Sequence, residues 1–389
     1  MGERTAMDAG RVGDRLRTLR KLRGVTQYQL AGQTHFSVSM IKKVEQGSVP
    51  PSAAFVAVSA RALGVSVSYL YGTDDRQMAE ESADISLEDL RAALDDWDDP
   101  RPEGRPLGLT AIDRRLDEVS RQVNGTRYAE AATKLAPLLR QLYPLVDTPG
   151  RAGEQARAAL HDTYRFAAAV AGRFRQVDLA AIASERHVRL APATGDPNRV
   201  AISAFHRSSR YLQRGDYAGG LRLLAGARRD IDERSQVAAQ LNLRSAVLAA
   251  RAGQLDRADE YVEQAREATE GEQYRGIDAT AVNIDVHWCA LPVEAMNGTE
   301  AVRRGAQVRL VDTSRPERIG HHHIDQARAW LLHGDRDRTL AELNAARRIA
   351  PFNTRHHPAV RETVLAMAES ARRRTDSVAG FARWAGITL

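Results

Sequence analysis

Apolar residues return every three or four positions along most of this chain, a spacing that gathers them on one face of an α-helix. Near the N-terminus, Val12, Leu16, Leu19 and Leu22 share such a face, and Gly24 follows them. Glycine is typical of the position just after a helix, because it adopts backbone conformations that other residues avoid. The pattern therefore predicts a first helix that ends before Gly24.

Three more helices are predicted after Thr26, Ser37 and Ser52, because serine or threonine just before an apolar-periodic run serves as an N-cap. The run after Ser37, VSMIKKVEQ, is stopped by Gly47, and a fifth short helix is expected in VSVSYLYG. The turn THFS separates the second helix from the third. Five short helices with a tight turn at this place predict a helix-turn-helix domain.

The second half of the chain contains a repeat. Three segments align on one register, and each has a glycine at the fifteenth place, between two helical runs. Glycine permits a tight turn between paired helices. The segments are residues 201–227, 239–265 and 320–346, with turn glycines Gly215, Gly253 and Gly334. Weaker copies place further turn glycines at Gly125, Gly172 and Gly298, and a closing helix pair is expected from residue 358 onward.

These patterns predict an all-α fold whose second part is a helical superhelix with a concave face. An acidic segment ending in three prolines separates the two parts. Residues 1–73 hold ten Lys or Arg and four Asp or Glu, whereas residues 74–103 hold three Arg and twelve Asp or Glu. Because such a shift marks a domain boundary, we expect a first domain at 1–73, a linker at 74–110 and a repeat domain at 111–389.

The linker contains one amphipathic stretch. Its apolar residues lie along one helical flank, which is typical of a helix that packs on the neighbouring domain; a dimerisation helix is the alternative. The flank consists of Ile85, Leu87, Leu90, Leu94 and Trp97.

Charge and composition limit the class of protein. A basic domain followed by an acidic strip is typical of a module that binds a polyanion, although ordinary solvated faces would look similar. The chain has no stretch of 18 apolar residues, no apolar signal segment, and a single cysteine, Cys289. We expect a soluble cytoplasmic protein with Cys289 in its core. The chain has 52 arginines and only four lysines, a composition typical of proteins from a high-GC bacterium.

The sequence offers little for catalysis. It contains no G-x-S-x-G, G-x-x-x-x-G-K-[ST], H-E-x-x-H or C-x-x-C motif. His321, His322 and His323 are adjacent, but neighbouring residues on a helix point about 100° apart and cannot share one metal ion. We therefore expect no enzyme activity, no cofactor and no metal site.

The segments TQYQLA, FSVSMIKKVEQG and ALGVS, at their spacing within residues 11–72, resemble the Cro/C1-type (XRE) repressor family. The resemblance implies a five-helix lambda-repressor-like domain whose third helix enters the major groove. It implies base contacts at Val38, Ser39 and Lys43. The candidate phosphate contacts are Gln27, Ser37, Lys42 and Arg17, with Arg20 facing phosphate or solvent.

Two turn residues depart from the family's pattern. His35 stands where glycine is usual, so we expect it to adopt a left-handed conformation at some energetic cost. Phe36 is expected to fill the buried turn position.

The aligned segments of the second half resemble tetratricopeptide repeats. First helices of such repeats line the concave face, where a ligand could bind. The resemblance nominates Phe205, His206, Ser209, Gln240, Arg244, Asp285, Trp288 and Arg328.

A Cro/C1-type domain followed by such repeats resembles a group of actinobacterial regulators and the peptide-pheromone sensors of Gram-positive bacteria. The resemblance implies a transcriptional regulator that binds a near-palindromic operator in double-stranded DNA as a homodimer. Such a protein would be nucleoid-associated when it is bound to DNA. A small molecule or peptide in the concave face would modulate operator binding. The alternatives are a protein-interaction scaffold tethered to DNA and a constitutive repressor whose repeats only dimerise.

Overall fold

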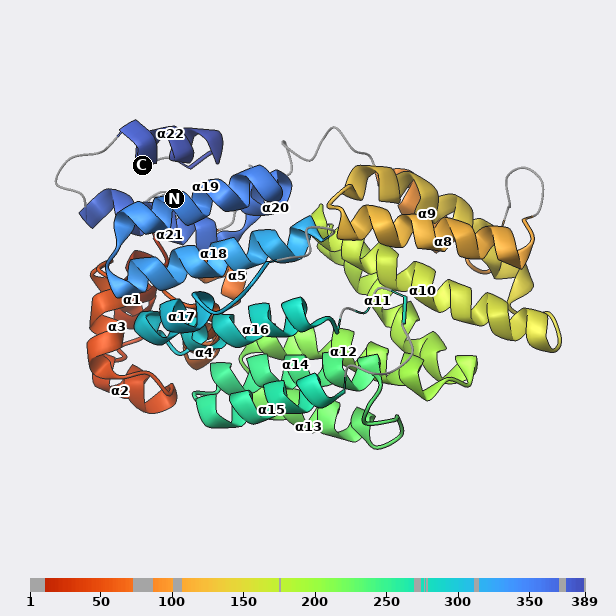
Figure 1. The fold of residues 1–389 in the computed structure, drawn as a ribbon, viewed down its shortest axis with the longest axis horizontal. Coiled ribbons are helices and arrows are strands. Elements are labelled where there is room, and N and C mark those ends of the chain that lie inside the picture. The colour runs from red at the N-terminus through yellow and green to blue at the C-terminus, as the bar shows by residue number, and fades with distance from the viewer. Residues whose placement is uncertain are drawn as a thin grey trace.

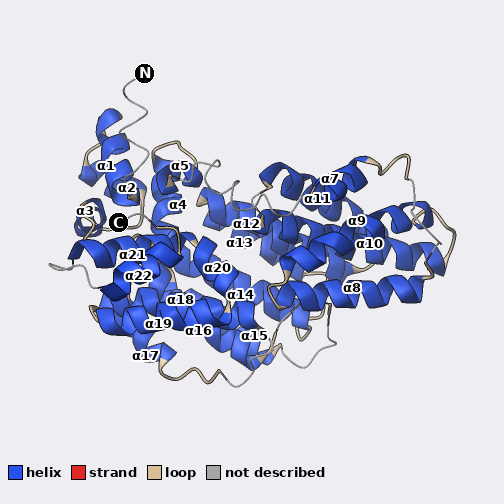
Figure 2. Cartoon of the chain, turned by 90° about the horizontal axis from the view of Figure 1, so that it is seen from above, coloured by secondary structure: helices blue, strands red, loops and turns tan. Residues whose placement is uncertain are grey.

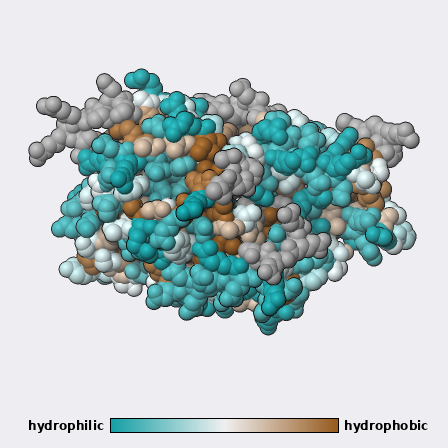
Figure 3. All heavy atoms as spheres, viewed as in Figure 1, coloured by the Kyte–Doolittle hydropathy of each residue, from teal (hydrophilic) through white to brown (hydrophobic). Residues whose placement is uncertain are grey.

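The structure is a computed structural model that describes residues 11–72, 87–100, 107–174, 176–268, 274–275, 277, 279–310, 315–370 and 376–387. Every regular element in these residues is a helix (Figures 1 and 2). The predicted all-α fold, with a helix-turn-helix domain followed by a superhelix, is confirmed. The face seen in Figure 3 is largely hydrophilic, with apolar residues showing in smaller patches.

Residues 11–72 form a five-helix domain, called the head below. Its helices begin where the sequence places N-caps: Thr26 accepts the N–H of Gln29 at 3.1 Å and Ser37 accepts that of Met40 at 3.2 Å. These bonds satisfy N–H groups that a helix start leaves without partners. The head consists of α1 (Val12–Leu22), α2 (Gln27–Gln33), α3 (Val38–Glu45), α4 (Ala53–Ala62) and α5 (Val67–Tyr71).

The turn between α2 and α3 differs from the expectation for His35. Among the described non-glycine residues, a positive φ occurs at Thr126 and Met296, so a left-handed His35 is wrong. Thr34 is extended, with φ −123° and ψ 167°. Phe36 is buried as expected, with its ring centroid 5.0 Å from that of Phe55.

The rest of the chain is built from antiparallel helix pairs that curl into a superhelix (Figure 1). Its elements are α7 (Glu88–Asp95), α8 (Leu109–Asn124), α9 (Tyr128–Leu142), η1 (Tyr143–Leu145), α10 (Arg151–Arg173), α11 (Val177–Leu190), η2 (Ala191–Thr194), α12 (Pro197–Arg214), α13 (Tyr217–Arg228), α14 (Gln236–Arg251), α15 (Leu255–Glu267), α16 (Ala281–Glu294), α17 (Gly298–Gly305), α18 (Pro316–His333), α19 (Arg336–Ile349), α20 (Pro351–His356), α21 (Pro358–Ser370) and α22 (Asp376–Trp384).

Three predicted helix pairs are confirmed. Gly215, Gly253 and Gly334 have φ of 67°, 77° and 105° and join α12 to α13, α14 to α15 and α18 to α19. A side chain is strained at such φ values, which explains the glycines.

The weaker copies of the repeat turn differently. Gly172 lies inside α10, and the left-handed residues near Gly125 and Gly298 are Thr126 and Met296, with φ of 60° and 61°. Gly125 is the C-cap of α8 and Gly298 is the first residue of α17, so both lie at the predicted turns without a left-handed conformation, whereas the turn predicted at Gly172 is misplaced. At Gly298 the helices pack closely instead, since an added Cβ would lie 2.8 Å from the carbonyl oxygen of Ala329.

The linker helix α7 belongs to the core of the helical region. Leu87, Leu90 and Leu94 are buried in one apolar cluster with residues of α8 to α11. Trp97 is 57% exposed and Ile85 lies outside the described residues. The apolar flank thus packs within its own chain, in line with the simpler interpretation.

Two ends of the superhelix meet. The hydroxyl of Tyr128 in α9 donates to Oδ1 of Asn353 in α20 at 3.3 Å, and the Phe352 ring lies 5.9 Å from that of Phe174. Arg173 at the end of α10 pairs with Glu317 at the start of α18, and Figure 1 shows these two helices meeting. The superhelix is therefore closed across these contacts.

The head packs on this superhelix through α4. The N–H of Ala54 donates to Oε2 of Glu294 at 3.2 Å, and Nη1 of Arg61 donates to the carbonyl of Gly215 at 2.9 Å. The hydroxyl of Tyr217 donates to the carbonyl of Ala54 at 3.3 Å. Apolar residues of both parts belong to one buried cluster. We call this contact the head–repeat interface.

Cys289 is buried, as the sequence predicts. None of the helices in the described residues is long and apolar enough to span a bilayer.

Three histidines, of which His187 is buried and His287 and His357 are half-buried, should make the fold sensitive to acid. Burial lowers the pKa of His187 to about 2 and those of His287 and His357 to about 3. The unfolded chain, with histidine pKa near 6.5, then binds protons that the folded chain does not, so stability falls as the pH drops below 6.5. Each histidine should remove about 1 kcal/mol of unfolding free energy between pH 7 and 5.5, measured by urea denaturation at both pH values.

His357→Asn tests the cause. The ring nitrogen Nδ1 of His357 accepts the N–H of Ala359 at 3.2 Å, a bond that asparagine can reproduce without titrating. The variant should show a smaller pH dependence than the unmodified protein. Equal urea midpoints at pH 7 and 5.5 in the unmodified protein would contradict the prediction.

Candidate nucleic-acid interface

Helix α3 presents a basic face to solvent. Its apolar positions Ile41 and Val44 are buried in the head, which leaves Ser39, Lys42 and Lys43 exposed. The helix lies at the outer edge of the molecule in Figure 1, on the side away from α8 to α10. The surface around it is therefore open to a large partner.

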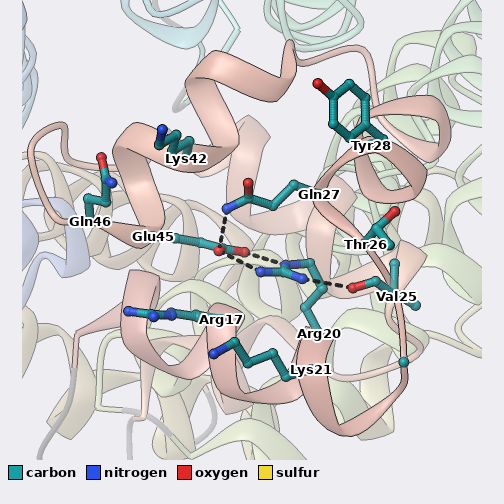
Figure 4. A pocket seen from close by; sticks show the side chains of 11 residues that line it. Arg17, Arg20, Lys21, Val25, Thr26, Gln27, Tyr28, Lys42, Glu45 and Gln46 are labelled. Atoms are coloured by element: carbon teal, nitrogen blue, oxygen red, sulfur yellow. Dashed lines mark hydrogen bonds and ion pairs between the residues drawn. The ribbon is translucent and has the colours of Figure 1, made fainter.

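A groove runs beside this face, between α1, the start of α2 and α3 (Figure 4). Arg17 and Lys21 line it from α1, Gln27 and Tyr28 from α2, and Lys42 from α3. Tyr28 is 77% exposed. Cationic side chains that converge around a groove attract phosphate groups, whatever the base sequence.

The floor of the groove is a buried ion pair. Arg20 donates to Glu45 at 2.6 and 2.8 Å, and Nη1 of Arg20 donates to the carbonyl of Val25 at 2.8 Å. Nε2 of Gln27 donates to Oε2 of Glu45 at 2.8 Å (Figure 4). The hydrogen bond to Glu45 raises the pKa of Arg20. The pair fixes α1, α2 and α3 relative to one another, so it sets the shape of the groove.

The structure thus corrects the expectation that Arg20 contacts phosphate or solvent. Arg20 is buried at the floor of the groove rather than exposed to solvent, and both of its edges bind groups inside the head. The sequence also did not predict a role for Glu45, because the charge of a residue does not reveal whether it is buried. The one available signal was a carboxylate at the end of an otherwise basic helix.

Three of the four candidate phosphate contacts lie together. Arg17, Gln27 and Lys42 line the same groove, although one amide hydrogen of Gln27 is already committed to Glu45. The exposed Ser37 accepts a hydrogen bond from the N–H of Met40 and keeps its own hydroxyl hydrogen for donation. Sequence reasoning missed Lys21 and Tyr28, whose exposure on α1 and α2 follows from packing.

The candidate base contacts lie on α3 beyond the groove. Val38 is half-buried at the first position of the helix, and Ser39 and Lys43 are exposed. Their roles remain predictions.

The nominated residues of the superhelix do not form one site. Phe205, His206, Gln240 and Arg244 line a shared cavity, and Ser209 accepts a hydrogen bond from Arg244 at 3.3 Å. The other three nominated residues lie outside this cavity. Asp285 pairs with Arg266 at 2.7 Å, Trp288 lies 4.9 Å from the guanidinium of Arg304, and Arg328 is buried between Glu294 and Asp325.

The three adjacent histidines diverge. The His321 ring lies 5.2 Å from that of His357, Nδ1 of His322 lies 3.5 Å from the sulfur of Cys289, and His323 pairs with Glu342 at 2.6 Å. Within the described part of the chain, no three His, Cys, Asp or Glu side chains are grouped so as to hold a metal ion.

Comparison with known proteins agrees with the geometry of the head. A helix-turn-helix domain family matches residues 11–69. The immunity repressor protein of Bacillus phage phi105 is 30% identical over 125 residues, which cover 30% of this chain and 87% of the phage protein. No solved structure matches the chain. The chain therefore belongs to the XRE-like family of helix-turn-helix DNA-binding transcriptional regulators.

Proposed function

We propose that the protein is a homodimeric regulator that binds a near-palindromic operator with α3 in the major groove. The exposed basic face of α3, beside the groove lined by Arg17 and Lys42, is the observation that carries the proposal. One head of this size covers too little DNA for tight specific binding, and two heads read two half-sites about 34 Å apart.

Each candidate residue has a role that suits its chemistry. The ammonium group of Lys43 donates to guanine O6 and N7, Val38 contacts a thymine methyl group, and Ser39 accepts several bases. The groove residues hold the phosphates and fix the register of the head on the duplex. These residues are Arg17, Gln27 and Lys42, and Ser37, the N-cap of α3 outside the groove, holds a further phosphate.

We further propose that a small molecule in the superhelix modulates operator binding. The head–repeat interface supports this proposal, because Ala54 and Arg61 tie α4 to Glu294 and Gly215. A head held in this way follows any change in the superhelix. A ligand that binds the DNA-competent and incompetent arrangements with different affinity shifts the balance between them.

Lys43→Ala should weaken specific operator binding by roughly 1–3 kcal/mol and relax the preference at one base position. Lys42→Ala should weaken binding to all duplexes alike and lower the salt dependence by about one counterion. Genomic footprinting first supplies the operator. Fluorescence anisotropy with operator and random duplex, at several salt concentrations, then separates the two effects.

Lys134→Ala is the matched control, because Lys134 lies on α9 and pairs with Glu118 at 2.5 Å, away from the head. It should bind the operator as the unmodified protein does. An unchanged footprint and affinity in Lys43→Ala would refute a base contact at that position.

A further inference from the structure

A cavity lies inside the superhelix where α8, α9, α10, α12, α14 and α18 meet. Its volume is about 270 Å³, near the lower end of the roughly 300–1,000 Å³ of small-molecule sites. Among its charged lining residues are five arginines and one glutamate. They are Arg165, Arg173, Arg244, Arg315, Arg318 and Glu317.

Three of these arginines lie against aromatic rings that also line the cavity. Such stacking fixes the plane of a guanidinium group and leaves its N–H donors pointing outward along the edge. Arg165 and Arg244 are thereby preorganised for a planar or tetrahedral oxyanion, whereas Arg173 already pairs with Glu317. The guanidinium carbons lie 4.4 Å from the ring centroid of Phe166 for Arg165, 5.4 Å from that of Tyr128 for Arg173, and 4.3 Å from that of Phe205 for Arg244.

Arg244 provides charge that nothing in the described residues neutralises. Its hydrogen-bond partner is the hydroxyl of Ser209, and no described carboxylate pairs with it. Burial, together with the like charges of Arg251 and Arg318, lowers the pKa of Arg244 to about 10. The group is still charged at neutral pH, so the cavity keeps a positive potential.

Two further polar atoms of the lining lack partners. Nε of Arg165 and Oε1 of Gln240 are buried without a hydrogen bond, in side chains of residues only 6% and 8% exposed. Buried polar atoms are nearly always paired, and these two unpaired atoms belong to residues that line the cavity, so they point to a ligand there. Other atoms of Arg165 are engaged, since it donates to the carbonyl of Arg275 at 2.8 Å and lies 3.7 Å from Asp162.

We propose that this cavity binds a small organic anion. Its carboxylate or phosphate group lies between Arg244 and Arg165, and its apolar body lies against Phe205 and Phe166. The role of this anion as an effector of DNA binding rests on the proposed function. The cavity residues Phe205 and Arg244 belong to α12 and α14, whose C-terminal glycines Gly215 and Gly253 contact the head.

Benzoate, benzamide and inorganic phosphate are suitable probes, measured by equilibrium dialysis with the full-length protein in the absence of DNA. Benzoate has one carboxylate on an apolar ring, benzamide is its neutral counterpart, and phosphate is the anion without the body. We expect saturable binding of benzoate or phosphate, with whichever binds identifying the oxyanion. Benzamide should bind at least tenfold more weakly than benzoate, or not at all.

Arg244→Met, which keeps the stem of the side chain against Phe205, should lose at least tenfold in affinity for the anion. Arg338→Met is the matched control, because Arg338 stacks on Trp330 at 4.3 Å outside the cavity, and it should bind as the unmodified protein does. Circular dichroism shows whether each variant is folded.

Equal anion affinity in a folded Arg244→Met, or no saturable binding of either anion to the unmodified protein, would overturn the proposal. If Arg244→Met does not fold, the unmodified protein still tests the proposal. Where benzoate is the anion bound, equal affinity for benzamide overturns it. Where phosphate is the anion bound, equal affinity for uncharged glycerol overturns it. Because no DNA is present, a negative result leaves operator binding standing, and the Lys43→Ala experiment fails or succeeds independently.

Discussion

Replacing Glu45 by alanine is expected to destabilise the head by roughly 3–5 kcal/mol, since removal of one partner leaves a buried charge uncompensated. The side chains of Arg20 and Glu45 are 10% and 2% exposed, and the pair joins α1 to α3. Hydrogen exchange of the full-length protein should show a drop of this size in the opening free energy of α1 to α3. Affinity for the operator should also decrease, because the ion pair that forms the floor of the groove is lost.

The exposed pair Arg127–Glu130 is the control. Its side chains are 55% and 53% exposed, so water screens the interaction, and Glu130→Ala should cost less than about 1 kcal/mol. The double variant Arg20→Met/Glu45→Leu should recover part of the stability lost in Glu45→Ala, because it removes both charges. Equal exchange protection in Glu45→Ala and Glu130→Ala would show that the buried pair does not hold the head together.

Glu294→Ala should loosen the head from the superhelix, again at a cost of roughly 3–5 kcal/mol. Although burial alone would raise it, the pKa of Glu294 lies below its ordinary value because Arg251, Arg328 and the N–H of Ala54 stabilise the charged form. Its carboxylate oxygens lie 3.3 Å from Arg251 and from Arg328. Faster hydrogen exchange should appear in α4, with little change in α9.

Asp325→Asn is the control for Glu294→Ala, because it removes a negative charge beside Arg328 and leaves the hydrogen bond from Ala54 to Glu294 in place. Asp325 is the other partner of Arg328, at 2.9 Å, and no hydrogen bond or ion pair within the described residues joins it to the head. This variant should leave the exchange of α4 nearly unchanged. Protection of α4 that survives in Glu294→Ala would mean that the other contacts of the head–repeat interface fix the head without Glu294.

The sequence was sufficient for features that depend on neighbouring residues. N-caps at Thr26, Ser37 and Ser52 and left-handed turns at Gly215 and Gly334 are local, because each needs only a few residues of chain to form. Where the alignment was weak, as at Gly172, the turn was misplaced although the helix pair exists.

The site was predictable to a lesser extent. Motif and charge together placed Arg17, Gln27 and Lys42 near one another, and the structure gathers them around one groove. They could not distinguish Arg20 from Arg17. Both are arginines on α1, and only the packing of α3 buries one and exposes the other.

The sequence by itself determined that this protein is helical, where most of its helices begin and end, and that its first domain is a helix-turn-helix. The tertiary structure alone decided that the head docks on Glu294, that the superhelix closes at Asn353, and that arginines surround a cavity within it. The bonds at these two places join residues 240 and 225 positions apart. Helical periodicity repeats every few residues and carries no information over such separations, so only the packed chain reveals them.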